Sequence, residues 1–229
     1  ALEVLAHARV PAPRMVTAIR EVAAMLTAVV TGQILDVRGA AHTPAEVETI
    51  HRLKTSSYTT RSPLALGAIL AGADASVVDG LRAAGDPMGI AFQLQDDLLG
   101  TFGDPKKTGK SARGDLRQGK RTALVAELED FVAERRSLRD GELEGRRPSN
   151  ESGQATELLR RVLGVPGASD EDVDAVVRLM VDSGAKARVE ARRAALVADA
   201  SSTIERLSIS ADGKQLLLGA AAALARRED

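Results

Sequence analysis

The sequence predicts an all-α protein, and three features support this prediction. Only 2% of the 229 residues are aromatic, so the core must be built from alanine, leucine and valine, which suits packed helices better than a β-sandwich. Helix-start signals recur, such as the capping box TPAE at 43–46. Residues 86–103 are apolar on nearly every side, as in a buried helix. We expect a single helical domain over residues 1–229.

Proline and glycine divide the first half of the chain into helices. Proline suits the first helical turn, where its missing N–H is tolerated, and glycine suits the position just after a helix ends. The tripeptide Gly85-Asp86-Pro87 is expected to break or kink the chain before the central helix. The expected helices cover residues 13–37, 44–55, 62–71, 74–84 and 88–103.

The helical pattern returns after Thr122 in the second half of the chain. It is followed by a polar, turn-rich stretch at residues 140–153, which we expect to form a flexible loop. Asp170 is expected to cap a long helix that is interrupted near Gly184. The expected helices here cover residues 123–139, 154–163, 170–198, 200–208 and 211–226.

Charge and composition argue against several classes of function. The net charge of −1 offers no basic surface for nucleic acid or for an anionic membrane. The chain has no cysteine, which excludes disulfides and thiolate-bound zinc. The longest apolar runs, such as residues 216–225, are too short to cross a bilayer, and no signal peptide is recognisable. We therefore expect a soluble, cytoplasmic protein without a transmembrane segment.

The central helix carries one polar stripe. Gln93, Asp96, Asp97 and Gly100 follow at i, i+3, i+4 and i+7, so they lie on one side of the helix. Two adjacent carboxylates in a packed bundle repel each other and lose hydration, so they need cations or become protonated. They also lie near the negative end of the helix dipole, an unfavourable place for a structural role. The stripe therefore predicts a metal site.

A basic loop follows this helix. Taken alone, the acid pair also fits an exposed helix end, and the basic loop also fits a solvated surface. Together they can hold an anionic ligand whose metal ion is bound by the acids. Magnesium suits this arrangement, because it takes one or two carboxylates and completes its octahedron with waters and substrate phosphates. Seven basic residues lie within sixteen positions: Lys106, Lys107, Lys110, Arg113, Arg117, Lys120 and Arg121.

At these residues the chain resembles the trans-isoprenyl diphosphate synthases, and especially the bacterial geranylgeranyl-type polyprenyl synthases. The stretch is similar to the second aspartate-rich region of that family, and the similarity is close over residues 13–125. Gly100 departs from the pattern, since many members have a third aspartate there. The matching residues are Phe92-Gln93, Asp96-Asp97, Gly103-Asp104, Gly109-Lys110, Asp115-Leu116 and Gly119-Lys120-Arg121-Thr122.

The resemblance implies the helical bundle of the isoprenoid synthases and head-to-tail prenyl transfer, in which an allylic diphosphate reacts with isopentenyl diphosphate in the presence of Mg²⁺. It implies that Asp96 and Asp97 bind the metal, and that Lys54, Lys110 and Lys120 contact diphosphate oxygens. Thr55 and Gln93 would place dipoles near the allylic cation. Gln33 and Asp36 would line the cavity and organise metal-bound water. Relatives are usually homodimers that pair through a helix like the one at residues 14–38.

The first aspartate-rich region of the family has no counterpart before residue 86, and residues 1–9 resemble the end of a helix that began earlier. Three explanations compete: a fragment of a longer enzyme that is incomplete at its N-terminus, an inactive relic, or a non-catalytic helical partner subunit. We favour the fragment, because the lysines, Gln93 and the aspartate pair are all retained. A terpene cyclase would need an Asn/Asp-Ser/Thr-Glu triad that we do not find, and a structural scaffold would leave the aspartate pair unexplained.

Overall fold

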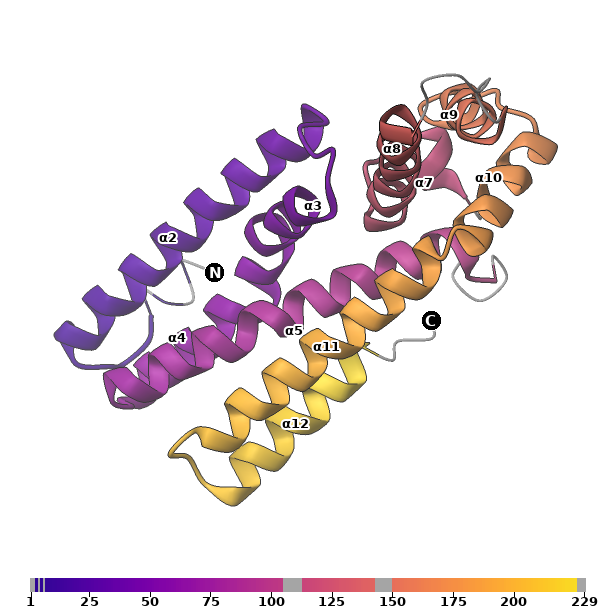
Figure 1. The fold of residues 1–229 in the computed structure, drawn as a ribbon. Helices are drawn as coiled ribbons and strands as arrows, with labels where there is room; N and C mark the ends of the chain where they lie inside the picture. Colours follow the sequence, from indigo (N-terminus) through magenta and orange to yellow (C-terminus); the bar gives the residue numbers. More distant parts are fainter. Residues whose placement is uncertain (1–2, 4, 6, 105–112, 143–149, 226–229) are drawn as a thin grey trace. The chain divides into compact units, whose positions relative to one another are not determined.

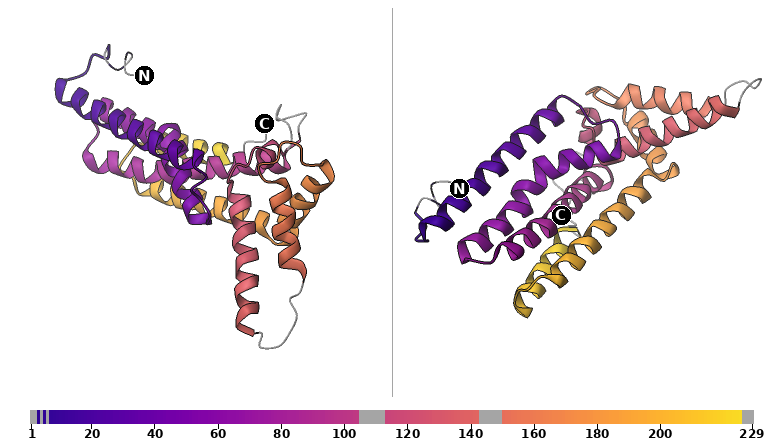
Figure 2. Two further views of the ribbon diagram at one scale, coloured as in Figure 1. Left: turned by 90° about the horizontal axis from the view of Figure 1, so that it is seen from above. Right: turned by 60° about the vertical axis from the view of Figure 1, so that its left-hand side comes forward.

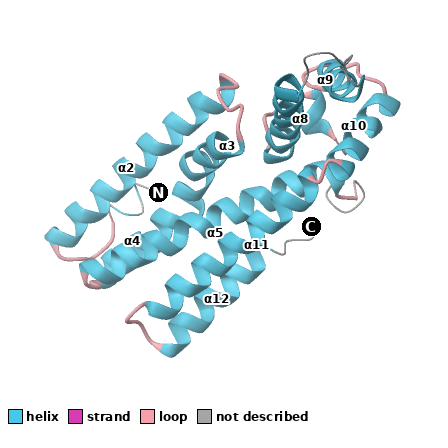
Figure 3. Ribbon diagram, in the orientation of Figure 1, coloured by secondary structure: helices cyan, strands magenta, loops and turns pink. Residues whose placement is uncertain are grey.

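The computed structural model describes residues 3, 5, 7–104, 113–142 and 150–225 (Figure 1). Every regular element in this part of the chain is helical (Figure 3), which confirms the all-α prediction. One element, η1, is a π-helix. The elements are α2 (Ala12–Val37), α3 (Pro44–His51), η1 (Arg52–Arg61), α4 (Ser62–Ala71), α5 (Ala75–Phe102), α7 (Gly114–Arg117), α8 (Ala123–Glu142), α9 (Asn150–Val162), α10 (Asp170–Asp182), α11 (Ala185–Arg206) and α12 (Ala211–Ala225).

The helices belong to two compact units, and α3, α5 and α11 each contribute to both. In the first unit α2 packs against η1 and α4, and in the second unit α8, α9 and α10 pack against one another. The single domain therefore stays a prediction. Residues 143–149 of the expected loop lie outside the described residues. The first unit contains Ala1–Arg38, Thr49–Gln93 and Arg192–Arg227, and the second contains Gly39–Glu48 and Leu94–Ala191.

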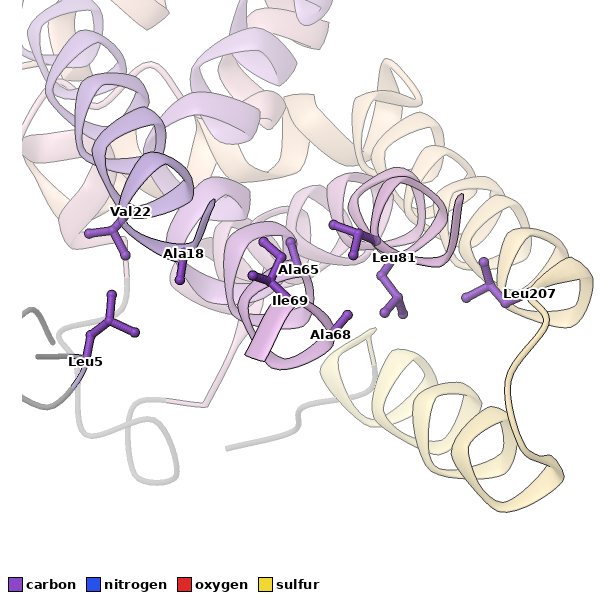
Figure 4. Close-up of a cluster of buried hydrophobic side chains, with 9 residues drawn as sticks. Leu5, Ala18, Val22, Ala65, Ala68, Ile69, Leu81 and Leu207 are labelled. Atoms are coloured by element: carbon purple, nitrogen blue, oxygen red, sulfur yellow. The ribbon is translucent and has the colours of Figure 1, made fainter. Parts of the chain in front are cut away.

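Small and branched apolar side chains fill the core of the first unit (Figure 4). Ala18 of α2 and Ala65 of α4 are fully buried, and short side chains at such positions let helices approach closely. A second cluster joins α5 to α11 and α12, where α12 folds back along α11 (Figure 2). The first cluster contains Leu5, Ala18, Val22, Ala65, Ala68, Ile69, Val78, Leu81 and Leu207. The second contains Ala84, Met88, Ala200, Ile204 and Ala221.

A buried carboxylate ties three helices of this unit together. Glu21 of α2 is only 5% exposed. Its Oε1 accepts a hydrogen bond from Ser62 Oγ of α4 at 2.7 Å, and its Oε2 accepts from Arg82 Nη2 of α5 at 2.6 Å. A buried carboxylate requires such partners, because an unpaired charge in the core is strongly destabilising. The contacts therefore fix the order and rotation of α2, α4 and α5.

Three glycines make room for η1 in the first unit. A Cβ added to Gly32 of α2 would lie 2.6 Å from the backbone nitrogen of Lys54. On the other side, a Cβ at Gly85 of α5 would lie 2.6 Å from Arg61 Cα, and one at Gly89 would lie 2.5 Å from Thr60 Oγ1. Any side chain at these positions would push the helices apart. The backbone of η1 is therefore held between α2 and α5.

Several predicted helix ends are confirmed. In the capping box the Thr43 N–H donates to Glu46 Oε2 at 3.0 Å, and the Glu46 N–H donates to Thr43 Oγ1 at 3.3 Å. The N–H groups of His42 and Thr43 lower the pKa of Glu46, because they stabilise its ionised form. Gly72 follows α4 with φ +82°, and Gly184 separates α10 from α11 with φ +78°. α5 ends at Phe102, before Gly103 as expected.

Other predicted boundaries are wrong. The helix expected to end near Thr55 continues as η1 directly into α4. Pro87 does not break α5, which continues through it from Ala75 to Phe102. The N-cap of α10 is Ser169, whose side chain accepts from the Asp172 N–H, and not Asp170. α11 runs to Arg206 without the expected break after residue 198.

Candidate active site

α5 presents the polar stripe as predicted. Gln93 and Asp96 are half-buried, and Asp97 is only 4% exposed. The three side chains lie at one-turn spacing along one helix, which places them on the same side of it. The local partners of Gln93 belong to the first unit, and those of the aspartates belong to the second. Each group can therefore be described within its own unit.

In the first unit, two consecutive residues of η1 bind partners on two different helices. Lys54 Nζ donates to Asp36 Oδ2 of α2 at 2.5 Å, and these side chains are 36% and 35% exposed. Thr55 Oγ1 donates to Gln93 Oε1 of α5 at 2.8 Å, and Thr55 is buried. The structure thus brings together four of the residues proposed from the sequence. Gln33 lies exposed on α2, one turn before Asp36.

In the second unit, Asp97 meets the beginning of α8. Its Oδ2 accepts a hydrogen bond from the Ala123 N–H at 2.9 Å, while Thr122 Oγ1 accepts from the Val125 N–H. The positive end of the α8 dipole stabilises a carboxylate at this position. This interaction compensates the unfavourable location that the sequence indicated at the end of α5. One oxygen of Asp97 is therefore engaged with the backbone, whereas Asp96 is half-buried beside it.

Lys120 lies among three carboxylates of the second unit. It forms an ion pair with Asp115, which is 20% exposed. Burial lowers the pKa of Lys120, but the hydrogen bond to Asp115 and the charges of Asp115, Asp96 and Asp97 outweigh burial and raise this pKa above its usual value. Lys120 therefore stays protonated at neutral pH.

Asp115 is the site residue that the sequence reasoning missed. A Cβ added to Gly100 would lie 2.5 Å from Asp115 Oδ2, so the missing side chain at Gly100 leaves the space that this carboxylate occupies. The Arg113 N–H also donates to the Gly100 carbonyl at 3.1 Å, which holds the returning chain against α5. A third carboxylate thus lies beside the stripe at the position where α5 carries none. The only sequence feature that could have indicated this contact is the glycine at position 100, within an otherwise polar stripe.

These residues fit a Mg²⁺ ion that is completed by its ligand. Among the residues that the structure describes, no group of three or more His, Asp or Glu side chains is arranged to hold a metal on its own. Mg²⁺ does not need such a group, because one or two carboxylates, waters and phosphate oxygens suffice. Asp96 and Asp97 provide the carboxylates, and the charged Lys120 nearby can bind a phosphate oxygen. Lys110 and the neighbouring lysines 106 and 107 lie outside the described residues.

Comparisons with known proteins agree with this geometry. The family model described as polyprenyl synthetase matches residues 1–159. Geranylfarnesyl diphosphate synthase from Aeropyrum pernix is 34% identical over 167 residues, covering 72% of this chain and 45% of the relative. (2E,6E)-farnesyl diphosphate synthase from Mycobacterium tuberculosis is 32% identical over 190 residues, covering 79% and 47%. The chain thus spans about half the length of these curated relatives.

A solved structure shows the same fold. Geranylgeranyl pyrophosphate synthase from Corynebacterium glutamicum, complexed with isoprenyl diphosphate and magnesium, is 30% identical to this chain and superposes with a TM-score of 0.80. The match covers 95% of this chain and 57% of that protein. Nearly all of this chain therefore has a structural counterpart within that protein.

The two neighbouring aspartates should respond differently to truncation. Asp97→Ala leaves the Ala123 N–H without its acceptor at the beginning of α8, so we expect the free energy of unfolding to fall by about 1–3 kcal/mol. Asp96→Ala is the matched control and should have a smaller effect on stability. Urea denaturation with amide exchange at the beginning of α8 measures both. Equal losses of stability in the two variants would contradict this division of roles.

Proposed function

The chain belongs to the polyprenyl synthetase family, and on this premise we propose that it carries the catalytic apparatus of a polyprenyl diphosphate synthase of the geranylgeranyl type. Such an enzyme transfers an allylic prenyl group to isopentenyl diphosphate and releases diphosphate. The names of the relatives support this choice of reaction. The observation that carries the proposal is the half-buried Asp96 on α5, with Asp97 beside it and the protonated Lys120 in the same unit.

The reaction begins when the bond between the allylic carbon and the diphosphate oxygen breaks, with the electron pair leaving on the oxygen. The double bond of isopentenyl diphosphate then attacks the cation, and loss of a proton to the departed diphosphate restores a double bond. The first step requires stabilisation of the negative charge on the leaving group. Mg²⁺, when bound, neutralises part of this charge.

The residues of the chain divide this work. Asp96 and Asp97 hold the metal ion, with Asp97 also fixed to the beginning of α8. Lys54, Lys110 and Lys120 bind diphosphate oxygens. Lys54 and Lys120 are paired with Asp36 and Asp115.

These counter-charges hold each ammonium group in place until a diphosphate replaces the carboxylate as its partner. The hydroxyl of Thr55 and the amide of Gln93 direct oxygen dipoles at the developing cation, and their mutual hydrogen bond fixes their orientation. Gln33 and Asp36 lie one turn apart on α2, where they organise metal-bound water.

We further propose that the protein is a cytoplasmic homodimer that pairs through α2. By length and composition α2 could cross a membrane, since its mean hydropathy over an 18-residue window is 1.4, and only 22% of that window is buried. This differs from the expectation that every apolar run in the sequence is too short to cross a bilayer. The exposed apolar side chains repeat at intervals of three, four or seven residues, which forms a continuous stripe along the helix. They are Val16, Ile19, Leu26, Val30, Ile34 and Val37.

A second copy of the chain can cover this stripe, because a two-fold axis brings the same apolar helix face of each subunit against that of its partner. Because most of these side chains are about half exposed, burying each one contributes roughly 0.7–1.5 kcal/mol.

Activity is tested with isotope-labelled isopentenyl diphosphate and a series of allylic diphosphates on the intact protein. We expect a labelled prenyl diphosphate whose formation requires Mg²⁺. Asp96→Ala should lower kcat by about 100-fold or more, because it removes the metal's anchor. Asp130→Ala, an exposed aspartate on α8, is the matched control and should leave kcat unchanged. Absence of product would support the relic or partner-subunit alternative, and an unaffected Asp96→Ala variant would refute the metal assignment.

The dimer is tested by a charge in the middle of the α2 stripe. Val30 is 57% exposed, and Val30→Asp should convert the dimer to a monomer in light scattering, because a buried aspartate pair at the two-fold interface is unfavourable. Leu216→Asp is the control, since Leu216 is 75% exposed on α12. A wild-type protein that is monomeric, or one that floats with lipid vesicles, would contradict a dimer through α2.

A further inference from the structure

The ten-residue π-helix η1 is the most unusual element of the first unit. π-Helical geometry is rare, occurs mostly as single turns, and is frequent at functional sites. η1 is longer than one turn and carries both Lys54 and Thr55. It also has a run of hydroxyl residues: Thr55, Ser56, Ser57, Tyr58, Thr59 and Thr60.

Two of these hydroxyls bind carbonyl groups of the helix itself. Ser57 Oγ donates to the Leu53 carbonyl at 2.5 Å, and Thr60 Oγ1 lies 3.2 Å from the Ser56 carbonyl. Each carbonyl belongs to the residue four positions before the hydroxyl residue. In an α-helix, this carbonyl would accept the backbone N–H of the same hydroxyl residue. A side chain that inserts at this place competes with the α-helical hydrogen bond and favours a wider turn. The hydroxyls therefore give a local cause for the π geometry.

The buried hydroxyls also anchor η1 to α5. Ser56 Oγ lies 3.2 Å from the Gly85 carbonyl, 3.1 Å from the Asp86 carbonyl and 3.3 Å from Asp86 Oδ1. Thr60 Oγ1 lies 2.7 Å from the Gly85 carbonyl. Ser56 is fully buried, and Thr60 is 4% exposed. These contacts occur where the glycines of α5 let the backbone of η1 approach.

Asp86, whose carboxylate lies near Ser56, destabilises the folded state at neutral pH. Burial raises the pKa of Asp86, although Arg61 at 3.5 Å and the hydrogen bond from Ser56 act in the opposite direction. A carboxyl group whose pKa is raised by folding destabilises the folded state above that pKa, and this penalty disappears as the pH falls below its value in the unfolded chain. Retention of an ionisable group at such a position is more common at functional sites than in a passive core.

From these contacts we propose that Ser57 and Thr60 are positioning residues for the reaction. Their hydroxyls hold η1 in its π register, so that Lys54 faces Asp36 on α2 while the next residue, Thr55, faces Gln93 on α5. In an α-helical register the hydrogen bonding shifts by one residue, and Lys54 and Thr55 rotate relative to these partners. The inference rests on the proposed function, because it assigns to Lys54 and Thr55 their roles with diphosphate and the allylic cation.

The test compares two neighbouring threonines of η1. Thr60→Val keeps the shape of the side chain but removes its hydroxyl. It should lower kcat by about tenfold to a hundredfold, as expected for a small misplacement of reacting groups, with KM for isopentenyl diphosphate changed by less than about twofold. Thr60→Ser keeps the hydroxyl and should restore kcat. Thr59→Val is the matched control, because Thr59 is only half-buried, and should behave like the wild type.

A structural readout separates this inference from the proposed function. Amide exchange of residues 52–61, and the fluorescence of the single tyrosine, Tyr58, should change in Thr60→Val and not in Thr59→Val. If Thr60→Val does not fold, Ser57→Ala takes its place. Unchanged kcat in an otherwise active enzyme, or equal losses in both threonine variants, would overturn the inference. An inactive wild type would refute the proposed function, and the exchange data would then still decide whether the hydroxyls hold the register.

Discussion

Close packing of the η1 backbone between two helices is the constraint on which the first unit depends. The absence of a side chain at Gly32 lets η1 approach the backbone of α2 closely, and Gly85 and Gly89 do the same on α5. Contact at this range fixes the axial position and the rotation of η1, since a helix in backbone contact on two sides cannot turn without a clash. The three glycines therefore set where η1 lies between α2 and α5, and the hydroxyl contacts of η1 set the register that directs Lys54 and Thr55.

Three acids of the candidate site have a cation or a helix N-terminus as their partner. Asp36 pairs with Lys54, Asp115 pairs with Lys120, and Asp97 binds the beginning of α8. These contacts stabilise the partly exposed charges of Asp36 and Asp115 and the buried carboxylate of Asp97. Under the proposed function, the oxygens of a diphosphate would bind the ammonium groups and its Mg²⁺ would bind carboxylates.

Local chemistry made part of this structure predictable. Several features depend only on residues close in sequence, and the structure contains them as predicted. They are the capping box at Thr43, the glycines that end α4 and α10, and the polar stripe of α5. The position of η1 between α2 and α5 depends on contacts between helices. Asp115 was missed for the same reason, because only the fold returns it to Gly100, fifteen positions earlier in the chain.

Binding of inorganic diphosphate to the unmodified protein tests the central claim most directly, because it needs neither turnover nor an allylic substrate. The account predicts that calorimetry will detect diphosphate binding at least about tenfold tighter with Mg²⁺ than with a chelator, a difference of about 1.4 kcal/mol. Equal affinity for diphosphate in the presence and absence of Mg²⁺ would contradict the claim that the aspartates of α5 hold a metal-bound diphosphate.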